Sequence, residues 1–189
     1  MHRNDVLDLF RRSGALLEGH FRLSSGLHSG GYLQCALVLQ DPRDAETLGR
    51  ALAGKVRGLN VEVVLSPAMG GLIIGHEVAR ALGARAIFAE RVEGRLTLRR
   101  GFALKPGERV LVVEDVLTTG LSTRETIDVA RAAGADVVGA AAIINRSESH
   151  GLDVGFAALA DYPLPAHQPG ACPLCAEGKP VVKPGSRGA

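Results

Sequence analysis

The segment VLVVEDVLTTGLST at residues 110–123 decides the fold that we expect for this chain. Its first four residues form an apolar, mostly β-branched run, typical of a strand that is buried on both faces of a parallel sheet. Glu114 and Asp115 then emerge at the carboxyl end of the strand, which is the edge where open α/β sheets bind ligands. A turn rich in hydroxyl groups follows and leads into a helical stretch. This order indicates a sugar-phosphate site.

The turn supplies the groups that a phosphate monoester requires. Four hydroxyl groups and successive backbone N–H groups come together at the start of a helix. The two carboxylates are left to bind sugar hydroxyls or a metal-bound sugar. The turn residues are Thr118, Thr119, Gly120, Leu121, Ser122 and Thr123.

A plain β–α connection is the alternative, because many buried strands end in an aspartate and a turn. Two adjacent acids followed by T-T-G-x-S-T favour the sugar-phosphate site. The segment lacks the Gly-Lys-Ser/Thr of a Walker loop and the G-x-G-x-x-G of a dinucleotide-binding turn. It resembles the phosphoribosyl pyrophosphate signature of the type I phosphoribosyltransferases. In that family the acidic pair binds the ribose 2- and 3-hydroxyls and the loop binds the 5-phosphate.

Composition and charge agree with a compact enzyme. The chain has 189 residues, 46% of them hydrophobic, and can therefore bury one substantial core in a single domain. A net charge of +2 excludes a strongly basic nucleic-acid-binding surface. Because no apolar run could cross a bilayer and the amino terminus lacks a secretion-signal pattern, we expect a cytoplasmic protein. Its 3 cysteines should stay reduced.

Apolar periodicity predicts alternating β and α units, and hence an α/β fold with a mostly parallel central sheet flanked by helices. Asn4 and Asp41 are the expected N-caps of the first two helices, and Gly58, Gly83 and Gly134 are expected helix stops. The expected helices lie at residues 4–12, from 42 to the stop at Gly58, 71–82 and 123–133; the strands lie at 61–65, 86–89, 110–113, 137–144 and within 151–160.

The resemblance implies the type I phosphoribosyltransferase fold with a small hood. We expect a single domain over residues 1–160, with the hood mainly in residues 1–35. Residues 19–32 are a loop or hairpin by their pattern. A tail rich in Pro and Gly follows at residues 161–189.

A second anion site is expected after the strand at residues 61–65. Small residues and backbone N–H groups at a helix start can hold an anion. The loop looks like the pyrophosphate loop of the phosphoribosyltransferases, and Arg91, at the end of the next strand, aligns with a pyrophosphate-contacting arginine. The loop residues are Ser66, Pro67, Ala68, Met69, Gly70 and Gly71.

Residues 91–109 carry six cationic side chains against two anionic ones. On charge alone a solvated hairpin is expected, since arginine and lysine normally face water. The position of this stretch between two strands instead resembles the family's mobile catalytic lid, at about residues 91–103. The resemblance implies that Arg95 and Arg99, together with Arg91, neutralise departing pyrophosphate.

The base is indicated by residues 19–32, GHFRLSSGLHSGGY, which are similar to the hood of orotate phosphoribosyltransferases. The form there is roughly F-x-L-x-S-G-x-x-S-x-x-Y. Arg146 lies just past a predicted strand, and its guanidinium suits the carboxylate of orotate, although a surface ion pair is the alternative. The expected orotate contacts are Ser24, Ser25, Gly26, Thr119 and Arg146.

The resemblance implies transfer of ribose 5-phosphate from phosphoribosyl pyrophosphate to N1 of orotate, in de novo pyrimidine synthesis. Glu114 and Asp115 would orient the ribose, and no protein nucleophile is expected. Magnesium would be held mainly by substrate and water rather than by protein ligands. In this family the lid commonly reaches into the neighbouring site, which implies a homodimer.

Some residues depart from the family pattern. Many orotate enzymes carry lysines in the hood, in the pyrophosphate loop and in the lid, and a histidine in the lid. Here Ser24 stands at the hood position, Gly70 lies near the loop position, and the lid offers arginines. Because arginine does not readily release a proton, a general-acid role for the lid is not expected.

Two other functions stay open. A purine phosphoribosyltransferase of the same fold would need a stacking aromatic, for which Phe156 or Tyr162 could serve. A regulator that senses phosphoribosyl pyrophosphate and binds nucleic acid would need a basic face or a winged-helix extension.

The Pro- and Gly-rich tail is predicted to be irregular. Within it Cys172 and Cys175 have the C-x-x-C spacing of metal ligands, but tetrahedral zinc needs four ligands, and only His167 lies nearby in sequence. A reduced knuckle without metal is therefore expected. Four other histidines are interpreted as surface or core residues rather than metal ligands: His20, His28, His76 and His150.

Overall fold

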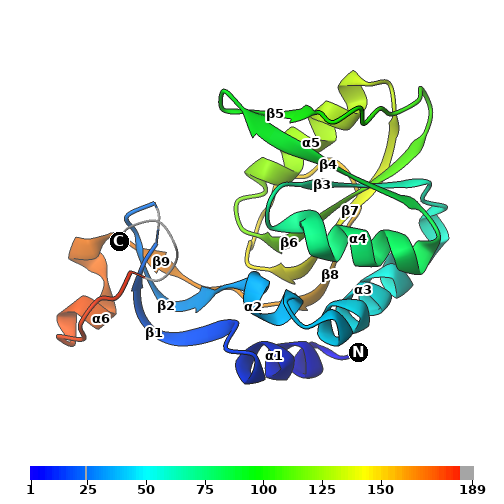
Figure 1. The fold of residues 1–189 in the computed structure, drawn as a ribbon. Helices are drawn as coiled ribbons and strands as arrows, with labels where there is room; N and C mark the ends of the chain where they lie inside the picture. Colours follow the sequence, from blue (N-terminus) through cyan, green and yellow to red (C-terminus); the bar gives the residue numbers. More distant parts are fainter. Residues whose placement is uncertain (24, 184–189) are drawn as a thin grey trace.

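The computed structural model describes residues 1–23 and 25–183, which form a main α/β body and a smaller β-sheet hood (Figure 1). The main sheet has the strand order β5-β4-β3-β6-β7-β8. Its strands pair in parallel except β5, which is antiparallel to β4. The predicted mostly parallel α/β sheet is thus confirmed. The strands are β3 (Val63–Pro67), β4 (Arg85–Val92), β5 (Arg95–Leu98), β6 (Arg109–Leu117), β7 (Asp136–Asn145) and β8 (Phe156–Asp161).

Helices cover both faces of this sheet (Figure 1). The helices α1 (Arg3–Arg12), α3 (Pro42–Val56) and α4 (Gly71–Leu82) pack on one face, and α5 (Leu121–Ala132) packs on the other. Successive side chains of a strand point to opposite faces. In β6, Leu111 and Val113 face the first group of helices, whereas Val110 and Val112 face the α5 side. Burial on both faces explains why this strand is apolar without alternation.

Several predicted helix ends are confirmed. Asp41 is the N-cap of α3 and accepts a hydrogen bond from the backbone N–H of Arg43 at 2.9 Å. Gly83, at φ +71°, ends α4 in the left-handed conformation that glycine adopts without strain. Gly134 lies directly after the C-cap of α5 with φ +80°.

Two other predicted ends are wrong. The N-cap of α1 is His2 rather than Asn4, because the Asp5 carboxylate accepts a hydrogen bond from the His2 backbone N–H at 2.8 Å and starts the helix earlier. Gly58 does not end α3. The chain continues through a short 3₁₀ helix, η1 (Arg57–Leu59), and it is Asn60 that adopts the left-handed conformation, with φ +48°. Asparagine tolerates this region better than most residues.

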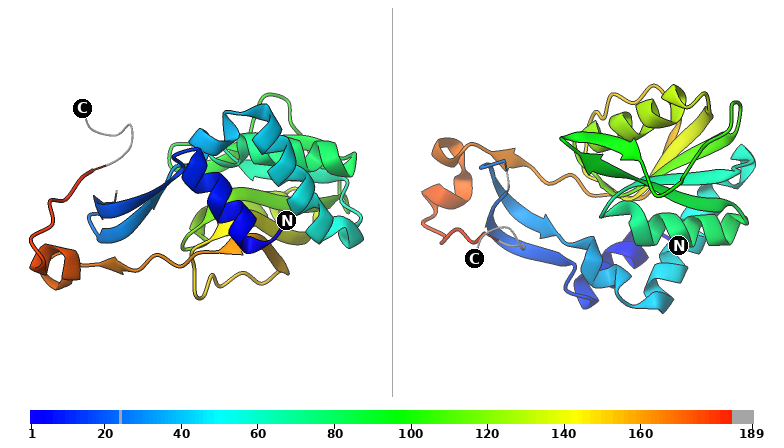
Figure 2. Two further views of the ribbon diagram at one scale, coloured as in Figure 1. Left: turned by 90° about the horizontal axis from the view of Figure 1, so that it is seen from below. Right: turned by 45° about the horizontal axis from the view of Figure 1, so that its top comes forward.

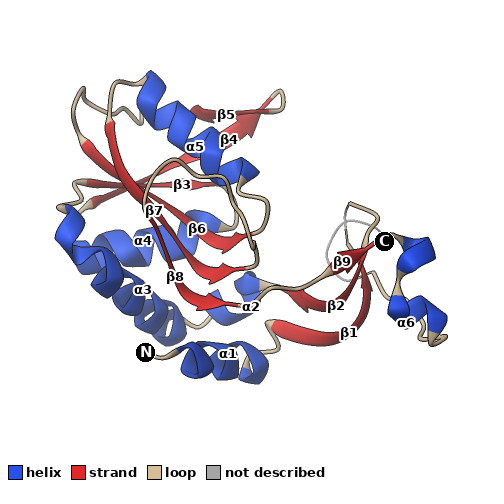
Figure 3. Ribbon diagram, turned by 180° about the vertical axis from the view of Figure 1, so that it is seen from behind, coloured by secondary structure: helices blue, strands red, loops and turns tan. Residues whose placement is uncertain are grey.

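The hood is an antiparallel sheet of strand order β1-β2-β9, formed by β1 (Leu16–Arg22), β2 (His28–Leu33) and β9 (Ala166–His167). The hairpin alternative for residues 19–32 is therefore correct. A short helix, α2 (Cys35–Leu39), returns the chain to the main body. Figure 3 shows the hood beyond the edge of the main sheet at which β6, β7 and β8 end. The apolar face of α1 packs in the core of the main body and not in the hood.

The tail packs on the hood, as Figure 2 shows. After β8 the chain adds β9, the 3₁₀ helix η2 (Pro169–Ala171) and the short helix α6 (Pro173–Ala176). Val182 then pairs with β1, where its N–H donates to the His20 carbonyl and its carbonyl accepts from the Arg22 N–H, both at 2.8 Å. The expectation of an irregular tail is wrong for these segments, because hood strands supply hydrogen-bond partners from the other end of the chain. In the described part of the chain, no helix combines the length and apolarity needed to span a membrane.

Candidate functional site

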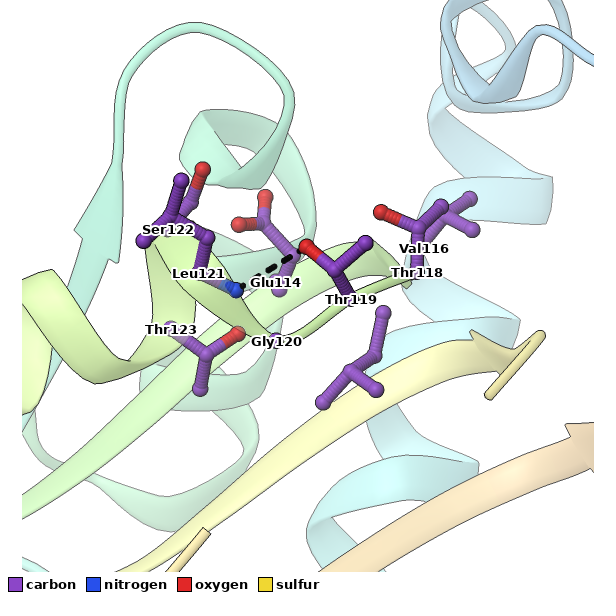
Figure 4. Close-up of a pocket in the computed structure, with 9 residues that line it drawn as sticks. Glu114, Val116, Thr118, Thr119, Gly120, Leu121, Ser122 and Thr123 are labelled. Atoms are coloured by element: carbon purple, nitrogen blue, oxygen red, sulfur yellow. Dashed lines mark hydrogen bonds between the residues drawn. The ribbon is translucent and has the colours of Figure 1, made fainter. Parts of the chain in front are cut away.

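The turn between β6 and α5 forms a polar pocket at the carboxyl edge of the main sheet. The cavity measures about 160 Å³ and is lined by Glu114, Val116, Leu117, Thr118, Thr119, Gly120, Leu121, Ser122 and Thr123. Figure 4 shows the Glu114 carboxylate and the hydroxyl-bearing side chains around this turn. The first backbone N–H groups of α5, which have no partners within the helix, border the pocket. The structure thus brings all six predicted phosphate-binding residues together.

Specific contacts hold the turn in this shape. Gly120 has φ +73°, and a Cβ atom there would lie 2.7 Å from the carbonyl oxygen of His150. The Arg124 guanidinium donates to the carbonyl oxygens of Thr119, at 3.0 Å, and of His150. The Thr119 hydroxyl accepts from the Leu121 N–H at 3.4 Å (Figure 4). A glycine is therefore required at position 120, where the turn meets the loop after β7.

The acidic pair lies in a poorly solvated position at the end of β6. Burial, reinforced by the charge of Asp115, raises the pKa of Glu114 from 4.5 to about 9, and its side chain is buried. Burial also raises the pKa of Asp115, whose carboxylate accepts from the Val116 N–H at 2.8 Å. Two adjacent carboxyl groups in such a site do not both ionise near neutral pH. In the absence of a ligand the pair therefore retains a proton.

The predicted pyrophosphate loop lies directly against the acidic pair. A Cβ atom on Gly70 would be 2.7 Å from a carboxylate oxygen of Asp115, so a larger residue there would require the Asp115 side chain to move. The peptide bond between Ala68 and Met69 is cis, and the Met69 side chain is 79% exposed. The Ser66 hydroxyl is buried and lies against Gly75 of α4, rather than in the exposed part of the loop.

Of the arginines of the predicted lid, Arg91 and Arg95 lie on the β4–β5 hairpin and Arg99 directly follows it. Its turn, Glu93 and Gly94, has positive φ at both residues, as a tight two-residue hairpin requires. Arg91 donates to the Glu125 carboxylate of α5 and to the Gly94 carbonyl. Arg95 and Arg99 are exposed. In this structure Arg91 is therefore engaged by an acid next to the phosphate-binding turn.

Arg146 follows β7 at the same sheet edge, and its backbone N–H donates to the Leu117 carbonyl at 2.8 Å. The side chain is half-buried, and burial lowers the pKa of the guanidinium. Among the described residues its buried Nε atom has no hydrogen-bond partner. Burying such a donor unpaired is unfavourable, so this nitrogen is a place for an anionic ligand. This atom therefore takes no part in the surface ion pair considered from sequence.

The hood loop is set apart from these residues. Figures 1 and 2 show β1 and β2 in the hood, apart from the β6–α5 turn. Ser25 and Gly26 are not among the residues that line the pocket. Both residues are exposed, and Gly26 has φ +83°. Ser24 lies outside the described residues. The structure thus assembles the sugar-phosphate half of the predicted site and leaves the predicted hood contacts on a separate element.

Sequence reasoning missed two neighbours of the site. Cys35 of α2 is fully buried, and burial together with the charge of Asp115 raises the pKa of its thiol. Glu125 pairs with Arg91 across 34 residues of sequence. Neither residue lies in a motif. The sequence held a weak indication for Glu125. An acid in the second turn of the helix after a phosphate-binding loop would repel a phosphate, so it is expected to have a cationic partner.

Comparison with known proteins agrees with this geometry. The family model described as "Phosphoribosyl transferase domain" matches residues 38–156. Relatives called orotate phosphoribosyltransferase in Heliobacterium modesticaldum and Pelotomaculum thermopropionicum are 55% and 51% identical; each match covers 99% of this chain, and 100% and 99% of the relative. The crystal structure of orotate phosphoribosyltransferase from Aeropyrum pernix matches with a TM-score of 0.67 at 27% identity, over 82% of this chain and 93% of that one. This chain therefore belongs to the phosphoribosyl transferase domain family and, within it, to the orotate phosphoribosyltransferases.

Proposed function

We propose that this chain transfers ribose 5-phosphate from phosphoribosyl pyrophosphate to orotate, giving orotidine 5-phosphate and pyrophosphate in pyrimidine nucleotide synthesis. The observation that carries the proposal is the joint placement of the acidic pair, the hydroxyl-lined turn and the glycine loop at one sheet edge. The turn at the start of α5 lies next to Glu114 and the glycine loop lies next to Asp115, so two segments that could offer N–H groups to anions flank carboxyl groups that suit a ribose diol. No other part of the described chain combines these features.

Each part of the site has a distinct task in this reaction. The turn at the start of α5 would bind the 5-phosphate through its hydroxyl and N–H groups. The pyrophosphate would lie at the loop of residues 68–71, where Gly70 leaves room beside Asp115. Glu114 and Asp115 would accept hydrogen bonds from the ribose hydroxyls once they ionise. Bound ribose therefore helps the pair to release its proton.

Arg146 supports orotate as the base. Its buried Nε is unpaired among the described residues, and its backbone is hydrogen-bonded to Leu117, which lines the pocket. Guanidinium binds a carboxylate in a bidentate manner, and among the bases considered only orotate carries one. The names of the relatives agree with this choice. Arginines in the hairpin stand where many orotate enzymes use lysines.

The chemistry that we propose breaks the bond from the anomeric carbon to pyrophosphate and forms a bond from that carbon to N1 of orotate. The pyrophosphate leaves with the bonding electrons, and the N1 proton of orotate passes to solvent. Arg91, freed from Glu125, would neutralise charge on the leaving group, with Arg95 and Arg99. No protein nucleophile takes part. Rate acceleration would come from positioning and from exclusion of water.

Magnesium fits the donor atoms of this site. The pocket offers carboxylate and hydroxyl oxygens, the ligand type that this hard cation prefers. We propose that substrate oxygens and water would hold it mainly, rather than protein ligands. When bound, it would neutralise negative charge on the pyrophosphate.

We also propose a cellular location and an oligomeric state. We place the enzyme in the cytoplasm, as a homodimer in which the β4–β5 hairpin of one subunit covers the site of the other. The exposed Arg95 and Arg99 support this assignment, because side chains directed to solvent are available to a neighbouring site.

The test is turnover with a defined set of bases. Purified protein is incubated with magnesium, phosphoribosyl pyrophosphate and either orotate, adenine, hypoxanthine or xanthine, and product is separated by chromatography. We expect conversion of orotate alone. Asp115→Asn should abolish most activity, whereas Asp153→Asn, which alters an exposed carboxylate paired with Arg131, should not. Turnover of a purine would overturn the choice of base, and binding of phosphoribosyl pyrophosphate without turnover of any base would point to a sensor.

A further inference from the structure

Four metal-ligating side chains from distant parts of the chain meet between the hood and the tail. They are His20 of β1, His28 of β2, Cys172 before α6 and Cys175 within α6. Their ligand atoms all lie within 4.8 Å of one another. Three of the four side chains are buried, with His20 5%, His28 6% and Cys172 3% exposed. We propose that this His₂Cys₂ cluster is a structural zinc site that fastens the tail to the hood.

The distances are close to those of a tetrahedral site. His20 Nε2 lies 2.9 Å from His28 Nδ1, 3.5 Å from Cys172 Sγ and 3.7 Å from Cys175 Sγ. His28 Nδ1 lies 3.2 Å from Cys175 Sγ. Zinc bonds of about 2.0–2.1 Å to nitrogen and 2.3 Å to sulfur place ligand atoms roughly 3.3 to 3.8 Å apart in a tetrahedron. Small side-chain rotations therefore suffice to accommodate the ion.

The tautomer of His20 is fixed by its second nitrogen. His20 Nδ1 lies 2.8 Å from the Lys179 carbonyl oxygen, and a carbonyl only accepts hydrogen bonds, so Nδ1 carries the proton. In the neutral ring Nε2 is then a bare lone pair directed into the cluster. Metal-bound histidines usually donate their other N–H to a carbonyl or carboxylate in this way.

Hydrogen bonds alone satisfy this arrangement poorly. The lone pair of His20 Nε2 is approached by one imidazole nitrogen and two sulfur atoms, yet it can accept only one good hydrogen bond. A zinc ion accepts a lone pair from each of the four ligands at once. With two thiolates and two neutral imidazoles the site is also electrically neutral, so its burial carries little electrostatic cost.

The local backbone suits a ligand pair on the tail. The Ala176 N–H donates to the Cys172 carbonyl at 3.2 Å, and the Gly178 N–H donates to the Cys175 carbonyl at 2.9 Å. Gly178 has φ +69°. These bonds wrap residues 172–178 into a compact turn that presents both sulfur atoms to the hood. The C-x-x-C spacing is the usual one for structural zinc.

The composition of the hood interior is consistent with stabilisation by a metal ion. Apart from Phe21, and Leu16 at the junction with the main core, its buried side chains are polar or sulfur-bearing: His20, His28, Ser29 and Cys172. Small units with little apolar burial are commonly stabilised by a metal ion or a disulfide. Because His20 and His28 stand on either side of the hairpin loop at residues 23–27, the zinc ion would also fix the base of that loop.

Metal analysis of the full chain, purified without a histidine tag, tests the proposal. We expect about one zinc ion per chain by mass spectrometry of metals. Cys175→Ser changes an exposed side chain and should fold, yet it should lose most of the metal. His167→Gln is the matched control, because His167 lies in the neighbouring strand β9 outside the cluster and its loss should leave the zinc content unchanged.

Cobalt(II) provides a readout that needs no variant. Chelator-treated protein, kept anaerobic and given one equivalent of cobalt, should show the visible bands of a tetrahedral ion and a thiolate-to-metal charge-transfer band. Addition of zinc should remove both. The proposal is overturned if the treated protein binds neither metal, if the cobalt spectrum is octahedral, or if the purified chain has a mass lower by two hydrogens because Cys172 and Cys175 form a disulfide.

Discussion

The buried carboxyl of Glu114 makes the stability of this protein depend on pH in an unusual direction. Its pKa is raised from 4.5 to about 9 by burial and by Asp115. Between these values the unfolded chain has lost the proton and the folded chain keeps it, so the free energy of unfolding falls as pH rises. We expect Glu114→Gln to gain stability over wild type between about pH 5 and about pH 8, by at most about 1.4 kcal/mol per pH unit.

Denaturant unfolding of both proteins at several pH values measures this difference. Glu148→Gln is the control, since Glu148 is exposed in the loop after β7, and its difference from wild type should stay constant. A constant difference for Glu114→Gln as well would mean that Glu114 is ionised in the folded protein.

Arg146 is the residue on which the choice of base depends. Arg146→Gln removes the guanidinium while keeping much of the side-chain length. A lost charged hydrogen bond is worth about 1.5–3 kcal/mol, so we expect KM for orotate to rise by about 10- to 100-fold. KM for phosphoribosyl pyrophosphate should change little, because the 5-phosphate and pyrophosphate loops are untouched.

Steady-state kinetics with each substrate varied in turn separates the two constants. Arg131→Gln is a suitable control, as Arg131 forms an exposed ion pair with Asp153 near the other end of α5. Equal increases in both KM values for Arg146→Gln would assign this arginine to the general shape of the site instead of to orotate.

The phosphate-binding turn can be tested by a pair of glycines with the same backbone conformation and different surroundings. Gly120 and Gly107 have φ +73° and +76°, but a Cβ atom would contact the His150 carbonyl only at Gly120. Alanine at either site should cost about 1–2 kcal/mol in stability for the left-handed backbone. Gly120→Ala should cost more, because that carbonyl must move.

The two variants should also differ in activity. Movement of the turn in Gly120→Ala displaces the N–H groups that hold the 5-phosphate, so KM for phosphoribosyl pyrophosphate should rise at least about 10-fold. Gly107→Ala should retain the wild-type KM. Thermal unfolding and kinetics together check this prediction, and similar KM values in both variants would exclude a role for the turn in binding.

The parts that sequence reasoning predicted well depend on local information. The strand, acids and turn at residues 110–123 are contiguous, and Asp41 and Gly83 act through hydrogen bonds and dihedral angles within a few residues. The alternation of strands and helices then leaves few arrangements besides a parallel sheet with the site at its edge.

The parts that it missed depend on contacts between distant segments. The sequence around Cys172 does not indicate that His20 and His28 lie close to it. These residues meet because β9 and Val182 pair with the strands of the hood in the folded protein. Likewise, the ion pair between Arg91 and Glu125 needs the hairpin to lie over α5. The periodicity of apolar residues along a strand or helix does not indicate which distant segments come into contact.

At the scale of the whole molecule, the hood and the β4–β5 hairpin extend from the main body as separate elements (Figure 1). The hood projects beyond the carboxyl edge of the sheet in Figure 3, and Arg95 and Arg99 are exposed. A closed oligomer commonly uses a two-fold axis, so two copies of one exposed element can each complete the other's site. A variant studied by itself cannot show whether the hairpin acts on its own subunit or on the neighbouring one. A mixture of two different variants can distinguish these cases.

Two inactive variants should restore activity when they exchange subunits. Arg95→Ala/Arg99→Ala lacks a working hairpin, and Asp115→Asn lacks a working ribose site. A mixed dimer holds one site with both native parts if the hairpin acts on the neighbour. Random exchange makes about half of the dimers mixed, so about a quarter of wild-type activity should return.

If the hairpin covers its own subunit's site, every site in the mixture keeps a defect and activity stays at the level of the separate variants. Mild denaturation and refolding of the mixture, with sedimentation to verify dimers, distinguishes the two cases, because only hairpin exchange links the activity to the fraction of mixed dimers.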